Sequence, residues 1–313
     1  MDVPSVAVLP LLVVAAAGVY FIYNWVLRFL SPSLVRNKVV VITDAVSGVG
    51  SECARLFHQG GARLVLCGTS WDKLESLFDS LTSDADLKET FAPKLVILDF
   101  SDMESMHEVV AEVGECYGCV DVLVCNSSMK LKAPVQSVSL ELDRNIMDIN
   151  YFGPSTLAKG LLPTMISRRS GHILLVNSIQ GRLAVPFRSS YAASKHAAQA
   201  FFDCLRAEVE EYGISVSTIS HTFINASGPE PGDTHTQAKP GGLAAFISSQ
   251  LTHGVSPAAL AGEVVRTVSR KRKEVLLAHP IPRVALLLRS LFPPLLFSVL
   301  AAGVKDSDMA EQM

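Results

Sequence analysis

The sequence predicts an α/β protein in which a doubly wound parallel sheet carries helices on both faces. Short runs of β-branched and other apolar residues, the pattern of strands buried on both sides, recur along most of the chain. Longer stretches with helical periodicity stand between them, and strands that alternate with helices pair in parallel. A glycine-containing turn at 44–50 joins the first strand to the first helix. These three observations decide the fold class.

The composition places an apolar excess at the two ends of the chain. Of 313 residues only 18% are charged, which is low for a soluble enzyme, and the net charge of -3 indicates no nucleic-acid partner. Residues 1–30 contain the uncharged run Val3–Leu27, long enough to cross a ~30 Å hydrocarbon core as a helix. We expect an uncleaved signal-anchor there, with a cleaved signal peptide as the alternative. Basic residues after the run favour a cytosolic domain.

The first predicted strand is Lys38–Thr43, and it leads through Asp44–Gly50 into a helix expected over Ser51–Gln59. Strand, glycine turn and helix in this order form a cradle for a dinucleotide, because backbone N–H groups and the helix N-terminus face the pyrophosphate. Gly48 and Gly50 would let the backbone approach it closely.

Further strands and helices continue the alternation. The second strand ends where an adenosine ribose would lie, and Asp99 ends the third strand, where its carboxylate could hold the adenine edge. The predicted strands are Arg63–Thr69, Lys94–Asp99, Asp121–Asn126, a run ending at Ser178, Ser215–Ser220 and Glu274–Ala278, and the predicted helices include Val138–Asn150, one carrying Tyr191, and one from Ser256 to Arg270.

Tyr191 and Lys195 stand four residues apart, so on a helix they share one face. A tyrosine normally loses its proton near pH ~10, but a fixed ammonium beside it stabilises the phenolate and lowers its pKa. Such a phenol is a general acid/base able to move a proton on or off an alcohol oxygen. Ser178, at the end of a buried strand, would direct its hydroxyl to the same oxygen.

The last third of the chain predicts a cover for the site and a second apolar segment. Asn225–Gly242 is rich in Gly, Pro, Thr and Ala and predicts a mobile loop over a substrate, followed by a short lid helix at Leu243–Thr252. Residues 281–304 are apolar but interrupted by Pro293-Pro294 and two arginines. That pattern favours a segment in the membrane interface, or a hydrophobic substrate entrance, over a span. Residues 305–313 are a polar tail.

Residues 37–280 together resemble the short-chain dehydrogenase/reductase family and its Rossmann-like fold. Thr43-x3-Ser47-Gly48-x-Gly50 is similar to the family's cofactor turn, and the strand before Asn126 resembles the one ahead of its Asn-Asn-Ala-Gly motif. Four residues match its catalytic tetrad: Asn150, Ser178, Tyr191 and Lys195.

The resemblance implies a role for each of these residues. Tyr191 would exchange the proton, Lys195 would lower the pKa of that phenol and bind the nicotinamide ribose, and Ser178 would orient the substrate oxygen. Asn150 would hold a water that connects Lys195 to solvent. The implied cofactor-binding residues are Thr43, Ser47, Gly48, Val49, Gly50, Asp99, Asn126, Tyr191, Lys195 and Ser227.

Within the family, the anchor and the residues around Ser178 are most similar to a microsomal branch that handles steroids and retinoids. This implies a lipophilic substrate, with all-trans-retinol oxidised to all-trans-retinal as the first expectation and a hydroxysteroid as the second. It also implies a location in the endoplasmic or sarcoplasmic reticulum membrane. Homodimers through two helices per subunit are common in the family and are possible here.

The cofactor residues depart from the family pattern. Asp44 stands where the turn has its first glycine, and His221-Thr222 replaces a Pro-Gly pair over the nicotinamide. A 2′-phosphate would favour a basic residue at Ser47 or Thr69, and neither is basic, so we expect NAD as the cofactor. The departures leave an alternative in which the protein is a catalytically idle dinucleotide sensor or membrane scaffold.

The other polar residues predict little chemistry. The Cys116–Cys119 pair has no second pair with which to form a zinc site. We expect His172 to lie at the surface or a sheet edge, and we expect Arg182 and Arg188 to be solvated loop cations near the substrate side. Met103 and Met106 are expected in the core.

Overall fold

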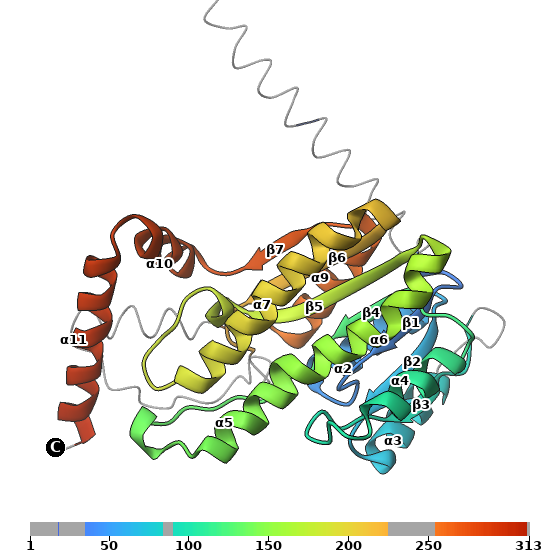
Figure 1. The fold of residues 1–313 in the computed structure, drawn as a ribbon, viewed down its shortest axis with the longest axis horizontal. Helices are drawn as coiled ribbons and strands as arrows, with labels where there is room; N and C mark the ends of the chain where they lie inside the picture. Colours follow the sequence, from blue (N-terminus) through green and yellow to red (C-terminus); the bar gives the residue numbers. More distant parts are fainter. Residues whose placement is uncertain (1–17, 19–34, 84–89, 225–253, 312–313) are drawn as a thin grey trace, which may run out of the picture.

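Seven parallel strands form one sheet in the computed structural model, which describes residues 18, 35–83, 90–224 and 254–311. The strand order is β3-β2-β1-β4-β5-β6-β7, and every neighbouring pair is parallel (Figure 1). The order reverses between β1 and β4, which makes their carboxyl ends the switch point where ligands bind in such folds. The strands are β1 Val39–Ile42, β2 Arg63–Gly68, β3 Lys94–Ile97, β4 Val122–Cys125, β5 Gly171–Ser178, β6 Ile214–His221 and β7 Glu274–Leu277.

Helices cover both faces of the sheet, as predicted. On one face α4, α6 and α7 bury Met106, Leu157 and Phe202 against the strands. On the other face α2, α3 and α9 bury Phe57, Leu74 and their apolar neighbours. The helices are α2 Gly48–Gln59, α3 Trp71–Ser83, α4 Met106–Glu115, α5 Leu140–Met147, α6 Gly153–Arg168, α7 Ser189–Val209, α9 Pro257–Arg270, α10 Pro280–Leu291 and α11 Pro293–Glu311.

Two helix boundaries differ from the expected ones. Helix α2 begins at Gly48 rather than Ser51, because the Ser47 side chain accepts a hydrogen bond from Gly50 N and caps the helix one turn earlier. The helix expected over Val138–Asn150 is α5 followed by a π-helical turn, Asp148–Phe152, which leads directly into α6. The strand boundaries agree with the expected ones to within two residues.

The apolar segment at 281–304 forms α10 and α11, separated at the predicted proline pair. Their inner faces pack Ala285 and Leu296 against Leu183, in the loop that follows β5. Their outer faces expose large apolar side chains: Val284, Leu287, Leu291, Phe292, Leu295 and Phe297. Within the described part of the chain, no helix has both the length and the apolarity to cross a bilayer. Apart from residue 18, the anchor expected at 1–30 lies outside the described residues, as do the loop and lid helix expected at 225–252.

Candidate functional site

The glycine turn after β1 is held together by its own polar groups. The Ser47 hydroxyl donates to the Asp44 carbonyl oxygen at 2.8 Å and accepts from Gly50 N at 3.1 Å. The Asn126 side-chain amide, from the end of β4, donates to Ser47 Oγ at 2.9 Å and to the Asp44 carbonyl oxygen at 3.3 Å. These bonds fix the path of the turn and join it to the neighbouring strand across the switch point.

Thr43 makes a second connection between the same two strands. Its side-chain oxygen accepts from the backbone N–H groups of Asn126 at 2.9 Å and Ser127 at 3.2 Å, and it lies 3.0 Å from the Ser127 hydroxyl. The Thr43 side chain is fully buried. Thr43 and Asn126 therefore shape the cofactor turn from beneath.

The two glycines of the turn have different tasks. A Cβ at Gly50 would lie 2.2 Å from the Asp44 carbonyl oxygen, so only glycine permits that backbone contact. A Cβ at Gly48 would meet only the Pro257 ring, at 3.6 Å, which is an ordinary contact. Gly48 is exposed at the first turn of α2, where backbone N–H groups lack intrahelical acceptors. The helix end therefore presents its donors to an anion.

Asp44 takes the backbone conformation that the missing glycine would have taken. Its φ is 49°, in the left-handed region that glycine adopts without strain. Burial raises the pKa of the Asp44 carboxyl, while a hydrogen bond from Ser47 and the charge of Lys73 lower it by less. The carboxyl is thus easier to protonate than an exposed one.

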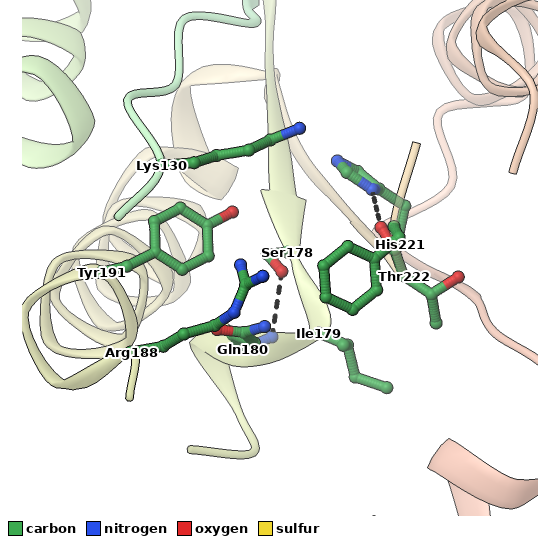
Figure 2. A pocket seen from close by; sticks show the side chains of 9 residues that line it. Lys130, Ser178, Ile179, Gln180, Arg188, Tyr191, His221 and Thr222 are labelled. Carbon is green, nitrogen blue, oxygen red and sulfur yellow. Dashed lines mark hydrogen bonds between the residues drawn. The ribbon is translucent and has the colours of Figure 1, made fainter. Parts of the chain in front are cut away.

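The predicted catalytic residues meet at the carboxyl ends of β5 and β6. Ser178 ends β5 and accepts a hydrogen bond from the Gln180 backbone N–H at 3.1 Å, while α7 carries Tyr191 and Lys195. The Lys195 ammonium nitrogen lies 5.9 Å from the centre of the Tyr191 ring. Ser178 and Tyr191 line one small pocket of about 20 Å³ (Figure 2), completed by Lys130, Ile179, Gln180, Arg188, His221, Thr222 and Phe223.

The expected lowering of the Tyr191 pKa was wrong in direction. Burial of the phenol raises its pKa, because the charged form loses its hydration. The hydroxyls of Ser178 and Ser128 and the charge of Arg188 lower the pKa by smaller amounts. Lys195 is itself buried, and desolvation lowers its pKa to about 7, so near neutral pH it carries only part of the charge that the sequence argument assumed.

Asn150 is fully buried in the π-helical turn, and its side chain clamps a neighbouring segment. Its Oδ1 accepts from Met129 N at 2.8 Å, and its Nδ2 donates to the Met129 carbonyl oxygen at 2.9 Å and to Ser194 Oγ at 2.9 Å. Asn150 thereby fixes both the segment after β4 and the helix that carries Tyr191. The water-holding role implied by the family stays a prediction.

Close packing also fixes the distance between α7, at Lys195, and the loop after β5. A Cβ on Gly181 would lie 2.7 Å from the Lys195 carbonyl oxygen and 2.6 Å from Asn177 Nδ2. Asn177 Nδ2 donates to the same Lys195 carbonyl oxygen at 3.2 Å and to Gln199 at 3.0 Å. The loop after β5 therefore lies directly against the helix, and no residue larger than glycine fits at 181 without movement.

Several residues lie elsewhere than the sequence predicted. His172 is buried, not at the surface, because its ring nitrogen bonds the Ser217 hydroxyl at 2.7 Å. Arg188 lines the catalytic pocket and is not merely a solvated loop cation, whereas Arg182 pairs with Glu274 outside it. Asp99 follows β3, as predicted; it is exposed and its Oδ1 accepts from the backbone N–H and hydroxyl of Ser101, and its role at the adenine edge stays a prediction.

Sequence reasoning did not assign Lys130 or His221 to the pocket that they line. Lys130 was not singled out at all, because no motif marks a lysine in a loop after β4. His221 was noted only as a departure, yet it is buried beside the pocket, where its Nδ1 bonds the Thr222 carbonyl oxygen and desolvation lowers its pKa to about 4. Ser227 lies outside the described residues.

The described residues fit a nicotinamide dinucleotide. The exposed end of α2 offers backbone donors for phosphates, and the carboxyl edge from β1 to β6 leads from that helix end to Tyr191. The buried side-chain oxygen of Gln180, which lines the catalytic pocket, has no hydrogen-bond partner among the described residues, as expected of a group that binds a ligand. Across the same part of the chain, no group of His, Cys, Asp and Glu is arranged to hold a metal ion.

Comparisons with known proteins agree with this geometry. The profile of the family described as short chain dehydrogenase matches residues 38–231. Dehydrogenase/reductase SDR family member 7C-A of Danio rerio is 67% identical over the full length of both chains. A short-chain dehydrogenase from Streptomyces avermitilis superposes with a TM-score of 0.66 at 23% identity, covering 88% of this chain and 97% of that one. An archaeal alcohol dehydrogenase from Thermococcus sibiricus, complexed with 5-hydroxy-NADP, has a TM-score of 0.62 at 25% identity and covers 77% and 96%.

Proposed function

The chain belongs to the short chain dehydrogenase family, and on that premise we propose that it interconverts an alcohol and a carbonyl on a lipophilic substrate with NAD. One observation carries the proposal: the Ser178 hydroxyl and the Tyr191 phenol line the same pocket, with Lys195 one helical turn behind the phenol. That arrangement places a proton donor and a hydrogen-bonding hydroxyl around one substrate oxygen.

The side chains divide the proton chemistry between them. Tyr191 exchanges a proton with the substrate oxygen, and Ser178 orients that oxygen. Because burial raises the Tyr191 pKa, the phenol is protonated at neutral pH and is ready to act as the acid in carbonyl reduction. Alcohol oxidation needs the phenolate and is therefore expected to gain as pH rises. A bound nicotinamide supplies or accepts the hydride.

NAD is proposed over NADP from the charges near the adenosine ribose. Neither Ser47, at the cofactor turn, nor Thr69, after β2, can form an ion pair with a 2′-phosphate. Gly68, at the end of β2, provides no carboxylate for a free ribose hydroxyl either. The lack of a cation weighs against NADP more than the lack of an acid weighs against NAD, since a phosphate without a partner costs more than a hydroxyl.

Two apolar regions of the chain support the proposed membrane location. The outer faces of α10 and α11 expose side chains such as Leu287 and Phe297, and the sequence between Glu274 and Asp306 contains no acidic residue. Arg283 and Arg289 lie among them. An apolar face with basic residues suits the surface of an anionic membrane. With the uncharged run at 3–27, this supports a location on the endoplasmic or sarcoplasmic reticulum membrane.

The test is turnover by the full-length protein in detergent with NAD and all-trans-retinol, followed by a hydroxysteroid panel. Tyr191→Phe removes the proton donor while keeping the ring, and it should lower turnover by about 10²–10⁴-fold. The variant should still bind NADH in calorimetry, because the other cofactor-binding residues are unchanged. Product formation equal in the two proteins would reject the catalytic role of Tyr191.

A dinucleotide sensor or scaffold is the second candidate, and Asp44 is the observation that favours it. A carboxylate in the phosphate turn opposes phosphate binding by its charge, while the backbone φ of 49° is the conformation that the missing glycine would take. Calorimetry with NADH and NADPH separates the cases. Binding without turnover over an alcohol panel would indicate a sensor, and no binding would indicate a scaffold.

A further inference from the structure

The catalytic pocket is positively charged. Among the described residues that line it, Lys130 and Arg188 are cations and none is Asp or Glu. Figure 2 shows both side chains directed toward the pocket that contains Tyr191 and Ser178. Neither cation is joined to a carboxylate within the described part of the chain, whereas Arg182, in the loop after β5, is paired with Glu274. The two cations of the pocket therefore have, in that part of the chain, no acidic partner of the kind that Arg182 has in Glu274.

Both cations are positioned by the fold rather than left on free loops. Lys130 directly follows Met129, whose backbone N–H and carbonyl are both bonded by Asn150. Arg188 precedes the first residue of α7, and its guanidinium carbon lies 4.7 Å from the centre of the Phe223 ring, a stacking contact that orients it. The two positive groups thus reach the pocket from separate elements.

Their charges already act on the catalytic groups. Lys130 contributes to the lowered pKa of Lys195 and of His221, and Arg188 lowers the pKa of Tyr191. Such effects require that the charges lie within interaction range of the reacting atoms. Like charges that face one pocket repel each other, and an anion between them would remove that cost.

We propose that Lys130 and Arg188 form an anion-recognition pair, and that the substrate carries a carboxylate or similar acid group close to its reacting carbonyl or alcohol. The inference rests on the proposed function and narrows its substrate class. Ile179 and Phe223 complete the pocket with apolar surface, so the substrate combines a hydrocarbon body with an acid group. All-trans-retinol has no acid group, and it should be a poorer substrate than a lipophilic oxo or hydroxy acid.

The cofactor phosphates are a less suitable anion for this pair. The donors for phosphate lie at the start of α2, beside β1 and β4, whereas the pair lies with Ser178 and His221 at the ends of β5 and β6. These are separate parts of the carboxyl edge. An effect of the pair on cofactor binding is therefore a distinct outcome that can be measured.

The test uses oxo fatty acids of graded spacing between carbonyl and carboxylate, each beside its methyl ester, with the full-length protein in detergent and NADH. The acid should be preferred over its ester by about tenfold or more in kcat/KM, mainly through KM, corresponding to about 1.4 kcal/mol. Arg188→Leu and Lys130→Met should each reduce the acid-to-ester ratio toward one. Arg182→Leu, a matched arginine outside the pocket, should keep the ratio.

Each other outcome overturns the inference in a distinguishable way. Turnover of the esters with a ratio near one in the unmodified protein rejects the anion pair and leaves the proposed function standing. An equal loss for acid and ester in Arg188→Leu assigns a structural role instead. If calorimetry shows that a variant binds NADH more weakly by the same factor by which its acid-to-ester ratio falls, the cations bind the cofactor rather than the substrate. Turnover of neither substrate class by protein that oxidises retinol or a hydroxysteroid rejects the inference alone, whereas no turnover of any of these substrates rejects the proposed function as well.

Discussion

The two halves of the sheet's carboxyl edge differ in whether their buried polar groups are hydrogen-bonded within the protein. At β1 and β4, Thr43, Ser47 and Asn126 bond one another and the backbone of the turn. Toward β5 and β6, buried oxygens of Asn177 and Gln180 have no hydrogen-bond partner among the described residues. The first half is built to hold a backbone shape, and the second half keeps polar capacity for a ligand. Substitutions of the groups that bond one another should therefore act mainly on shape, and substitutions of charged or unpartnered groups should act on ligand binding.

The largest effect is expected from Asn150→Ala, in the catalytic half. The change removes the side-chain partner of the Met129 N–H and carbonyl and the bond that Ser194 Oγ accepts, although Ser194 still donates to the Tyr191 carbonyl oxygen. The free energy of unfolding should fall by about 4 kcal/mol. Urea unfolding measures it. Asn145→Ala is the control, because that side chain makes a weak 3.7 Å contact with Met129 Sδ. Similar losses in both variants would contradict the clamp.

A pH effect on stability should come next, from His221. Burial lowers its folded pKa to about 4, so the folded state binds fewer protons than the unfolded state, whose histidine titrates near pH ~6.5. Stability should thus be lost as pH falls from 6.5 toward 4, by about 3 kcal/mol for this group. His221→Gln should flatten that part of the profile in urea unfolding at graded pH.

His107→Gln is the matched control for this profile, since His107 is exposed on α4. It should leave the slope unchanged. His172, which burial also gives a pKa of about 4, retains its own contribution in both variants. A slope in His221→Gln equal to that of the unmodified protein would show that His221 is accessible to protons in the folded state.

Gly50→Ala tests the half that holds a shape. Its new Cβ would press on the Asp44 carbonyl oxygen and the Ala45 backbone, which should lower the free energy of unfolding by about 2 kcal/mol and weaken NADH binding. Gly48→Ala adds the same methyl group where the nearest atom is 3.6 Å away, and its stability should be almost unchanged. Thermal unfolding and calorimetry of the pair decide the point, and equal behaviour would refute the assigned contact.

The smallest effect is expected at Asp44. Asp44→Asn removes the charge and keeps a residue that tolerates a left-handed backbone, so NADH should bind several-fold tighter, by about 1 kcal/mol. Asp44→Gly should show the same gain, because charge rather than shape is the main opposition. Calorimetry at low and high salt checks the electrostatic origin. Unchanged affinity in both variants would mean that the carboxyl does not face the phosphates.

Local pattern predicted the sheet and the meeting of Ser178, Tyr191 and Lys195, because strand periodicity and helical spacing determine which side chains share a face. It did not predict the direction of the Tyr191 pKa, since that depends on how deeply the phenol is buried. The positive φ of Asp44 lies where the family pattern has glycine.

Residues in loops, and residues buried through distant partners, were the ones that sequence reasoning misjudged. Lys130 and Arg188 reach the pocket because the segments after β4 and before α7 converge on it, which no spacing within either segment reveals. His172 is buried because Ser217, on the adjacent strand, bonds its ring. In both cases the deciding contact joins segments that are far apart in the chain.

The π-helical turn Asp148–Phe152 has a consequence for how the protein tolerates insertions and deletions. A wider turn accommodates one residue more than an α-helix, and each residue rotates a helix by about 100°. Losing one residue here would let α5 and α6 merge into a regular helix, turning the whole of α5 by that angle about its axis. Its apolar stripe, now over Ile146, would then face solvent. A single missing codon at this point would be more harmful than most point substitutions nearby.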